Sequence, residues 1–373
     1  MTIEDQHETD VSLMDRYPII AGTGAPRTRY QEVPSYAEGL YDLGRQVYAW
    51  MVPNGSWGES NAGLIVGEGE SLLVDTLWDV NYTREMLEAM HAVKGALPMK
   101  TVVNTHADGD HFFGNQLMSE AEIITSQASY DEMLHVQPRS MLLLGRVGKL
   151  LSTVRLFGGS QAGHWFQNMV APYDFAAVEH TLPTRTFTGE LTLDIGGRKV
   201  QLIEVGPAHT LGDLLVFLPQ EKILFSADIL FIESTPVMWA GPVDNMLSAL
   251  DRILEMDVDL IVPGHGPLTD KRGVQIVKDY WLYVKARATQ HYMSGLSAQD
   301  AAREIVLSDD YQKRPFANWN SPERMMVNVH TLFRHLAGRT DHPGVPELLQ
   351  ILRKQALLAQ QLPDAQPAVM RKR

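Results

Sequence analysis

The stretch that decides the fold reads Thr101-Val102-Val103-Asn104-Thr105-His106-Ala107-Asp108-Gly109-Asp110-His111. It begins with a β-branched apolar run, typical of a buried strand, and then places two imidazoles and two carboxylates within six consecutive positions. Imidazole nitrogens and carboxylate oxygens are ligands of divalent metals in proteins. The pattern His-x-Asp-x-Asp-His would arise by chance in only on the order of a few chains per thousand of this length. The stretch therefore predicts a metal site rather than an acidic loop.

Three more potential ligands stand where short apolar runs end. They are His209 in Gly-Pro-Ala-His-Thr, Asp228 after Ile-Leu-Phe-Ser-Ala, and His265 in Val-Pro-Gly-His-Gly. Strands of about 4–8 residues that end in Gly or Pro turns present their last side chains at the edge of a sheet. We therefore expect these three residues to meet the metal motif at one sheet edge.

With these residues together, the chain resembles the metallo-β-lactamase superfamily. The family motif is His-x-His-x-Asp-His, followed by a His before Thr, a bridging Asp after a strand, and a final His in Gly-His-Gly. The resemblance spans residues 37–275, and it implies two divalent ions, with zinc as the first expectation and iron or manganese as alternatives. It implies that His106, Asp108 and His209 hold one ion, that Asp110, His111 and His265 hold the other, and that Asp228 bridges the two.

Asp108 departs from the family pattern, which has His at this position. The Nδ1 atom of His and a carboxylate oxygen of Asp both lie two bonds beyond Cβ, so Asp108 can reach nearly the same coordination point. A set of two His and one carboxylate suits iron or manganese as well as zinc. The flavodiiron branch of the family also has a carboxylate here, and this keeps a di-iron oxidoreductase as the rival interpretation.

The composition fits an enzyme that acts on a small molecule. The net charge of −13 argues against nucleic acid or an anionic membrane as the main partner. The chain has no Cys, which excludes thiolate nucleophiles and Cys-bound metals. The N-terminus lacks the features of a signal peptide, and no apolar run approaches about 20 residues. We expect a cytoplasmic protein with a small-molecule substrate, and a homodimer is left open.

Two β-rich halves, each with flanking helices, predict an α/β fold of the αββα type, a four-layer sandwich with the metals at the sheet edge. A chain of 373 residues exceeds the usual size of a single core. The predicted division is an N-terminal arm over residues 1–36, the metal-binding domain over 37–275, a C-terminal helical extension over 276–345, and a mobile tail over 346–373.

Local patterns predict the elements that build these layers. They are antiparallel strands over 47–52, 62–66 and 71–75, a helix from an Asn81 N-cap to Gly95, a hairpin through Gly196-Gly197, a second hairpin between 214–217 and 223–225, a helix from about Asn245, and helix N-caps at Ser297 and Ser321.

Residues 133–178 interrupt the core between its two halves and differ from the rest in composition. Four basic residues, Arg139, Arg146, Lys149 and Arg155, stand against the single acid Asp174, among many large apolar side chains. This composition is compatible with a lid that recognises an apolar substrate with an anionic group. A helical pair packed on the core or on another subunit fits equally well.

The residues indicate metal-assisted hydrolysis. Two cations would lower the pKa of a shared water from ~15.7 toward ~7 and provide a hydroxide, with Asp110 as the catalytic residue that steers it and relays its proton. The expected substrate is a small, largely apolar ester, lactone or amide. The alternatives are the di-iron oxidoreductase and a hydrolase of sulfate or phosphate esters. Asp75, at a strand end, is expected to orient a ligand His or to cap a turn. Among the remaining His residues, only His164 is a candidate for substrate contact.

Overall fold

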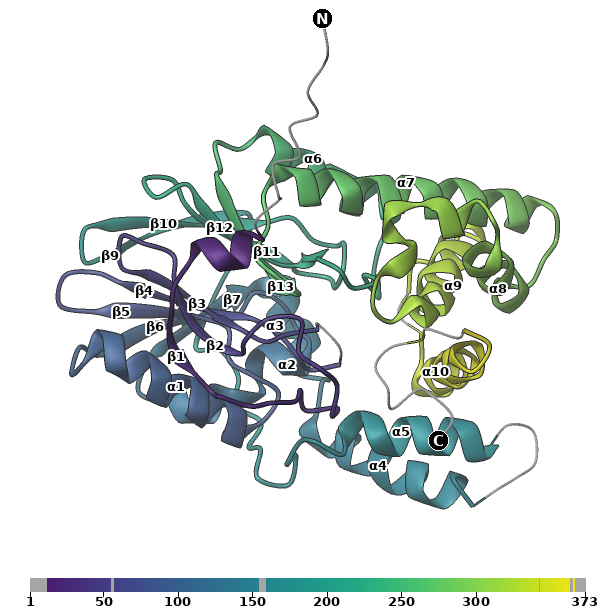
Figure 1. The fold of residues 1–373 in the computed structure, drawn as a ribbon, viewed down its shortest axis with the longest axis horizontal. Helices are drawn as coiled ribbons and strands as arrows, with labels where there is room; N and C mark the ends of the chain where they lie inside the picture. The colour runs from purple at the N-terminus through teal and green to yellow at the C-terminus, as the bar shows by residue number, and fades with distance from the viewer. Residues whose placement is uncertain (1–11, 55–56, 154–158, 342, 363–364, 366–373) are drawn as a thin grey trace, which may run out of the picture.

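The computed structural model describes residues 12–54, 57–153, 159–341, 343–362 and 365. Two β-sheets stack on each other, and helices cover the outer face of each (Figure 1). The C-terminal helices form a separate group beside one end of the sandwich (Figure 1). The architecture is therefore the αββα sandwich with a helical extension that the sequence predicts.

The first sheet has eight strands in sequence order. They are β1 (Ile19–Gly22), β2 (Gly39–Asp42), β3 (Val47–Met51), β4 (Ala62–Val66), β5 (Ser71–Val74), β6 (Met99–Val103), β7 (Glu122–Ser126) and β8 (Arg185–Phe187). Strands β1 to β5 pair antiparallel, as expected for β3 to β5, and β5 to β8 pair parallel. The parallel half brings the carboxyl ends of β5, β6 and β7 to one edge, and the metal motif follows β6 at that edge.

The second sheet has five strands in the order β13-β12-β11-β10-β9. They are β9 (Glu190–Ile195), β10 (Arg198–Glu204), β11 (Leu214–Leu218), β12 (Ile223–Phe231) and β13 (Leu260–His265). Both predicted hairpins are present, because Ile195 pairs with Arg198 and Leu218 pairs with Ile223. The pairing of β12 with β13 is parallel, so the residues near their carboxyl ends face the same edge.

Ten α-helices cover the sheets or form the extension in the described residues. They are α1 (Val80–Lys94), α2 (Gly109–Phe112), α3 (Gln127–Met133), α4 (Pro138–Leu151), α5 (Gly159–Val170), α6 (Val243–Glu255), α7 (Lys271–Met293), α8 (Ala298–Leu307), α9 (Met325–Leu336) and α10 (Val345–Ala359). The helix α1 begins at an Asp79 N-cap, two residues before the predicted Asn81, because the Asp79 carboxylate accepts the Tyr82 amide at 2.8 Å. It ends at Gly95 as predicted.

Alternation of side chains along the strands divides the apolar residues between two faces. Ile65, Leu72 and Val103 point to the second sheet and pack with its Val200 and Val216. The intervening residues of the first sheet face outward, and their cluster contains Leu64, Leu73 and Val102 with Met86 and Met90 of α1. Every strand in the middle of the sandwich therefore has both faces buried, which fixes its register.

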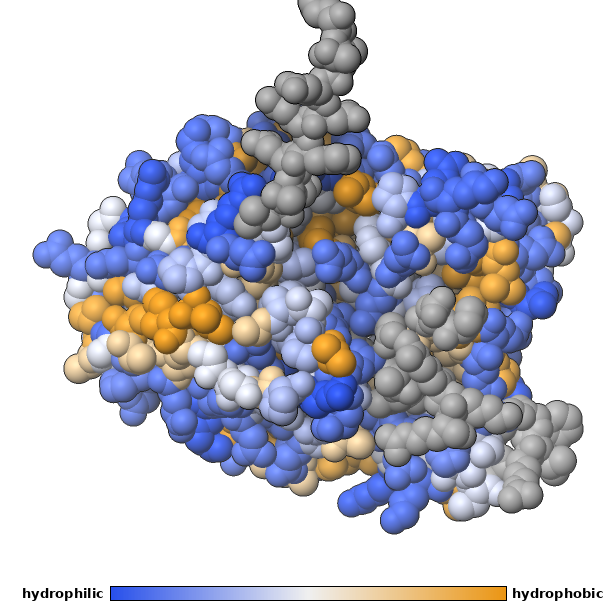
Figure 2. All heavy atoms as spheres, viewed as in Figure 1, coloured by the Kyte–Doolittle hydropathy of each residue, from blue (hydrophilic) through white to orange (hydrophobic). Residues whose placement is uncertain are grey.

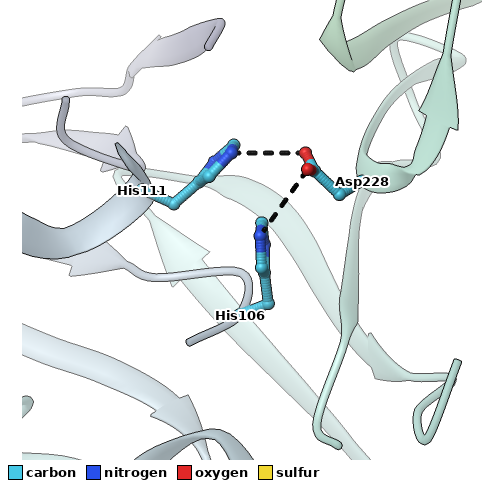
Figure 3. Close-up of side chains that lie close together, drawn as sticks. All are labelled: His106, His111 and Asp228. Atoms are coloured by element: carbon cyan, nitrogen blue, oxygen red, sulfur yellow. Dashed lines mark ion pairs between the residues drawn. The ribbon is translucent and has the colours of Figure 1, made fainter. Parts of the chain in front are cut away.

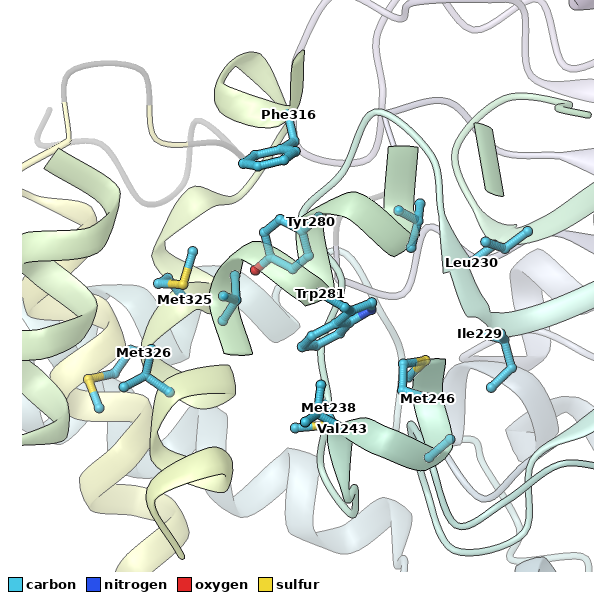
Figure 4. Close-up of a cluster of buried hydrophobic side chains, with 14 of the residues drawn as sticks. Ile229, Leu230, Met238, Val243, Met246, Tyr280, Trp281, Phe316, Met325 and Met326 are labelled. Atoms are coloured by element: carbon cyan, nitrogen blue, oxygen red, sulfur yellow. The ribbon is translucent and has the colours of Figure 1, made fainter. Parts of the chain in front are cut away.

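The helical extension is joined to the second sheet by one continuous apolar cluster. Figure 4 shows Tyr280 and Trp281 of α7 at its centre, with Phe316, Met325 and Met238 around them. Trp281 and Tyr280 are fully buried. Burial of a large aromatic side chain contributes about 1.5–3 kcal/mol, so the extension packs firmly against the metal-binding part.

Two elements lie in segments for which the sequence predicts no regular structure, namely the mobile tail over 346–373 and the arm over 1–36. Val345–Ala359 form helix α10, and Ile351, Leu352 and Ala356 bury one face of it. At the other end, Ile19–Gly22 of the predicted arm form β1 on the edge of the first sheet. This short edge strand is apolar throughout and mostly exposed, so it has no alternation of apolar and polar residues to predict from.

The N-cap predictions in the extension have different outcomes. Ser297 caps α8, because its hydroxyl accepts the Asp300 amide at 3.2 Å. Ser321 adopts a left-handed conformation (φ 58°) and accepts no capping bond, and a short 3₁₀ turn over Pro322–Arg324 leads into α9 instead.

The face in Figure 2 is mostly hydrophilic, with apolar residues gathered mainly near its left-hand edge. Among the helices of the described residues, none has both the length and the apolar character needed to cross a bilayer.

Candidate metal centre

The metal motif lies in the turn between β6 and η2 (Phe113–Met118), where a single helical turn, α2, places Asp110 and His111 side by side. Gly109 begins this turn under the ring of Phe113. A Cβ at Gly109 would lie 2.7 Å from that ring, so a larger residue would displace the turn. The glycine thus allows α2 to lie close to the core and to direct its two donors at the sheet edge.

The seven predicted ligands converge at one place. His106 and His111, which follow β6 of the first sheet, point toward Asp228, which lies in β12 of the second sheet (Figure 3). Donor atoms within 4.8 Å of one another form three overlapping groups, which are His106, His111 and Asp228; His106, Asp108 and His209; and Asp110, His111 and His265. The last two groups are the two ligand sets that the family resemblance implies.

Asp228 lies at the centre of the cluster. The Nε2 atoms of all four imidazoles approach its carboxylate, at 3.8 Å for His106, 3.2 Å for His111, 3.4 Å for His209 and 3.2 Å for His265. Asp228 lies within β12 rather than at its end, where the pairing with β13 is irregular and Ala227 has a positive φ of 46°. This bulge turns the Asp228 side chain toward the cluster.

The glycine before His265 has a steric role at this bulge. A Cβ at Gly264 would lie 1.9 Å from the Asp228 carboxylate. The Gly-His context, from which the sequence analysis selects His265, therefore reflects the close approach of β13 to Asp228.

Asp75 orients two of the imidazoles from the end of β5. Its Oδ2 accepts from His111 Nδ1 at 2.9 Å and from the Thr105 hydroxyl at 2.7 Å. Because the Thr105 hydroxyl donates to Asp75, it accepts from His106 Nδ1 at 3.0 Å. Both rings therefore hold their proton on Nδ1 and present the Nε2 lone pair to the cluster. Of the two roles predicted for Asp75, these contacts favour the orientation of a candidate ligand His.

The other two imidazoles are oriented by backbone carbonyls. His209 Nδ1 donates to Val237 O at 2.7 Å, and His265 Nδ1 donates to Glu59 O at 3.0 Å. All four His residues thus present Nε2 inward, in the tautomer that a metal requires.

The electrostatics of the cluster depend on the balance of burial and charge. Burial lowers the pKa of His106 well below its ordinary value, and neighbouring His111 adds to the effect. Burial also acts to lower the pKa of His111, but the negative charges of Asp228, Asp110 and Asp75 outweigh it and raise that pKa well above its ordinary value. Protonated imidazole therefore balances the buried carboxylates wherever no cation does so.

The chemistry of the donor set fits divalent cations. His106 Nε2, His111 Nε2 and Asp228 Oδ1 are buried and have no hydrogen-bond partner in the part of the chain that the structure describes. Buried polar atoms almost always have partners, and unpartnered ones that face each other indicate a missing ligand. The three ligand carboxylates also supply negative charge that two divalent cations would neutralise.

Asp108 has a partner that a His at this position would lack. The Trp239 indole donates to Asp108 Oδ2 at 3.1 Å, and His209 Nε2 lies 3.1 Å from the same oxygen. A carboxylate has enough lone pairs to accept the indole and to bind a cation, whereas a metal-bound imidazole has no free acceptor. Asp108 and Trp239 therefore form a matched pair, and neither residue's sequence context predicts it.

The cluster opens on the side of Asp108 and Asp110. Their side chains are 33% and 13% exposed, whereas those of His106 and His111 are fully buried. Two partly buried indoles lie near this opening, because the Trp57 ring lies 6.3 Å from that of Trp239. An aromatic surface therefore lies beside the exposed side of the cluster.

The 133–178 segment contributes to this surface through α5. Trp165 is buried and meets Trp57 edge to face at 5.6 Å. Arg139 and Arg146 of α4 and His164 of α5 are exposed instead. Arg155 lies outside the described residues.

Two large surface cavities lie away from the centre. One, of about 920 Å³, is lined by residues of the β3, β4 and β10 hairpin ends, and the other, of about 780 Å³, is lined by loops that include Ile232 and Gly266. None of the seven candidate ligands lines either cavity.

Comparisons with known proteins show which family the chain resembles. A family model described as the metallo-beta-lactamase superfamily matches residues 55–265. The 2,4-dinitroanisole O-demethylase subunit alpha of Nocardioides sp. (strain JS1661) is 24% identical over 280 residues, 73% of each chain. Hydroxyacylglutathione hydrolase of Bartonella tribocorum is 25% identical over 117 residues, which are 31% of this chain and 46% of the relative.

A solved structure shares the fold over most of this chain. The stereoselective inverting sec-alkylsulfatase Pisa1 from Pseudomonas sp. superposes with a TM-score of 0.59 at 16% identity, covering 85% of this chain and 52% of that one. This chain therefore spans about half the length of the sulfatase, and the likeness concerns the fold alone. The family match extends over more than half of the chain and includes all seven candidate ligands. Relatives of the chain in this family include metallo-hydrolases. The chain therefore belongs to the metallo-beta-lactamase superfamily.

Proposed function

We propose that the protein hydrolyses a small, largely apolar ester, lactone or amide with the help of two divalent ions, zinc in the first instance. The observation that carries this proposal is the convergence of four inward-facing Nε2 atoms and three carboxylates on Asp228. His106, Asp108 and His209 would hold one ion, Asp110, His111 and His265 the other, and Asp228 would touch both.

When bound, such ions lower the pKa of a water molecule toward neutrality and polarise the oxygen of the bond to be cleaved. The protein supplies positioning and proton handling around them. Asp110 Oδ2 lies 3.4 Å from His265 Nε2 at the open side, and burial raises the pKa of its carboxyl. Asp110 is therefore suited to take the proton of the attacking water and to return it to the leaving oxygen or nitrogen.

The substrate class follows from the opening. Trp57 and Trp239 present flat apolar surface beside Asp108, and α5 adds Trp165 behind Trp57. A flat or aromatic group of the substrate would stack there and leave its carbonyl near the ions. The segment 133–178 would thus support the wall of the substrate site, because Trp165 of α5 packs behind Trp57.

A second candidate is cleavage of a sulfate ester or of an activated aryl ether. The relative that matches 73% of both chains is named for O-demethylation of 2,4-dinitroanisole, an aryl methyl ether. Hydrolysis of such an ether consumes one water and releases a phenol and methanol. The same centre could activate that water, and the same indoles could stack on the aromatic ring.

The test combines metal analysis with a panel of substrates. Protein purified without added metal should contain about two divalent ions per chain, and it should hydrolyse at least one of an aryl ester, a lactone, an alkyl sulfate and 2,4-dinitroanisole. Asp228→Ala should lose both metal and activity. The matched control is Asp79→Ala, which removes a carboxylate that is equally buried but caps α1.

Three results would contradict the proposal. They are full activity with one ion or none, an Asp228→Ala variant that keeps its metal, and iron with charge-transfer bands in protein that hydrolyses nothing in the panel. The last result would favour the di-iron oxidoreductase.

A further inference from the structure

A buried arginine reaches the metal centre from the C-terminal extension. Arg324 ends the 3₁₀ turn before α9 and is only 3% exposed. Its Nη1 donates to the Ser234 hydroxyl at 3.2 Å and to Thr235 O at 2.9 Å, and within the described residues these are its hydrogen bonds. The buried Nε has no partner in the described chain. Among the residues that the structure describes, the Nε and Nη2 edge of the guanidinium therefore has no acceptor.

The guanidinium lies one aromatic ring away from the candidate ligands. Its central carbon is 5.5 Å from the centre of the Phe231 ring, and that ring stacks on His265 at 4.7 Å with an angle of 8°. On another side it lies 5.6 Å from the Trp57 ring, part of the aromatic surface at the opening. Burial lowers the pKa of Arg324, while the negative charge of Glu323 and then those of Asp228 and Asp110 act to raise it.

Attachment of α9 to the loop after β12 does not explain why a charge is buried here. Asn328 makes the same attachment with two bonds, from Nδ2 to Pro236 O at 2.8 Å and from Met238 N to Oδ1 at 3.0 Å. Thr331 adds a third, to Met238 O at 2.9 Å. Burial of a charge with unused donors is costly unless something binds those donors.

The free edge has a known preference. Nε and one Nη of an arginine donate two parallel N–H bonds, which match the two oxygens of a carboxylate or of a similar oxyanion. The Trp57 indole Nε1 is a second buried donor without a partner in the described chain. Donors without acceptors thus lie on both sides of the cation–π contact between Arg324 and Trp57.

We propose that Arg324 is a specificity-determining residue, and that its Nε and Nη2 edge binds an oxyanion group of the substrate that takes no part in the reaction. The substrate is then an ester, lactone or amide that also carries a carboxylate or a comparable oxyanion, separated by a flat or short apolar spacer from the bond that is cleaved. The identity of the bond that is cleaved rests on the proposed function. Binding of the oxyanion group by Arg324 can be measured without any reaction.

Binding to the zinc-loaded protein tests the proposal without turnover. We choose two matched pairs of probes, terephthalate with 4-acetylbenzoate and glutarate with 5-oxohexanoate. In each pair one carboxylate can reach the metals, and the other end is either a second carboxylate or an uncharged methyl ketone of similar shape. Isothermal titration should show that at least one dicarboxylate binds about 10- to 100-fold more tightly than its partner, as expected for a charge-assisted pair of hydrogen bonds.

Substitutions assign that preference to a residue. Arg324→Met should abolish it with unchanged zinc content, and Arg324→Lys should restore only part of it, because an ammonium group cannot form the side-on pair of bonds. The matched control is Arg334→Met, which removes another buried arginine of the same region, 6% exposed and paired with Glu347 at 2.7 Å. This control should change stability but not the preference.

The outcomes separate this proposal from the proposed function. A wild type without any preference for dicarboxylates, or an Arg324→Met variant that folds and keeps the preference, overturns the role of Arg324. If Arg324→Met does not fold, Arg324→Lys decides, because an undiminished preference in that variant also excludes the side-on contact. A preference that depends on Arg324, in protein that is purified with iron, shows charge-transfer bands and hydrolyses nothing in the panel, would uphold the anion site and contradict the hydrolase.

Discussion

Replacement of Asp75 by Asn should weaken metal binding although Asp75 is not a candidate ligand. The Asp75 carboxylate accepts three hydrogen bonds, from Thr105 N at 2.7 Å, from the Thr105 hydroxyl at 2.7 Å and from His111 Nδ1 at 2.9 Å. The last two bonds converge on the same oxygen. An asparagine can keep the backbone bond only by placing its NH₂ group where two donors point.

The magnitude follows from what this change does to the imidazoles. His111 loses the acceptor of its Nδ1 proton, so the tautomer that presents Nε2–H to Asp228 becomes competitive. His106 loses the same support indirectly, because the Thr105 hydroxyl no longer has the carboxylate as its acceptor. Loss of such an outer contact typically costs 10- to 100-fold in metal affinity, or about 1.4–2.8 kcal/mol.

The assay is a competition titration of zinc between the protein and a chromophoric chelator, with circular dichroism to verify the fold. Asp79→Asn is the control, because Asp79 is buried to the same degree and accepts the Tyr82 and Asp174 amides away from the cluster. That variant should lose stability and keep its zinc affinity. Equal zinc affinity in Asp75→Asn and the wild type, or equal losses in both variants, would refute the orienting role of Asp75.

Two further predictions concern Asp108 and Glu323. Asp108→Ala should lower the metal content at the first site, and an unchanged metal content would show that Asp108 is only a loop carboxylate. Asp108→His should bind zinc in preference to iron or manganese. Its zinc affinity should stay below that of the wild type, because Trp239 Nε1 loses its acceptor. Burial raises the pKa of Glu323 from 4.5 to about 8, so the folded protein keeps a proton that the unfolded chain releases, and stability should fall as pH rises from 4.5 to 8. Glu323→Gln should remove this pH-dependent loss of stability. It should raise the free energy of unfolding by up to about 5 kcal/mol at pH 9 and have little effect near pH 4.5. Urea unfolding curves at both pH values measure this, and an equal change in the free energy of unfolding at both pH values would exclude titration of Glu323 as the cause.

The candidate ligands could be found from sequence because each is tied to a local signal. His106, Asp108, Asp110 and His111 stand within six positions, so their proximity needs no knowledge of the fold. His265 and Asp228 follow apolar runs of strand length, and parallel pairing of β12 with β13 brings them to one edge. The four-layer architecture followed from the same strand and helix periods.

Other parts of the fold gave no such signal. The first sheet ends in β1, whose four residues are exposed or partly exposed and show no alternation. The face of α10 that becomes buried includes Gln355, a fully buried polar residue, and small side chains such as Ala356, which weaken an apolar pattern. Tertiary contacts rather than local periodicity determine both elements.

The residues that surround the reaction were the least predictable from sequence, and the reason is physical. Metal ligands need donors of a few types at fixed mutual distances, which rigid strand ends supply and which leave a motif in the sequence. Recognition of a substrate needs only one indole or guanidinium at the right point in space, and any loop can supply it. Trp57, Trp239 and Arg324 come from three segments far apart in the chain, and each looks like an ordinary core or surface residue in its own context. The basic composition of 133–178 drew attention to arginines that are exposed on α4. Arg324 has no such signal in the sequence, because only the packing of α7 and α9 on the second sheet brings it beside Trp57 and Phe231.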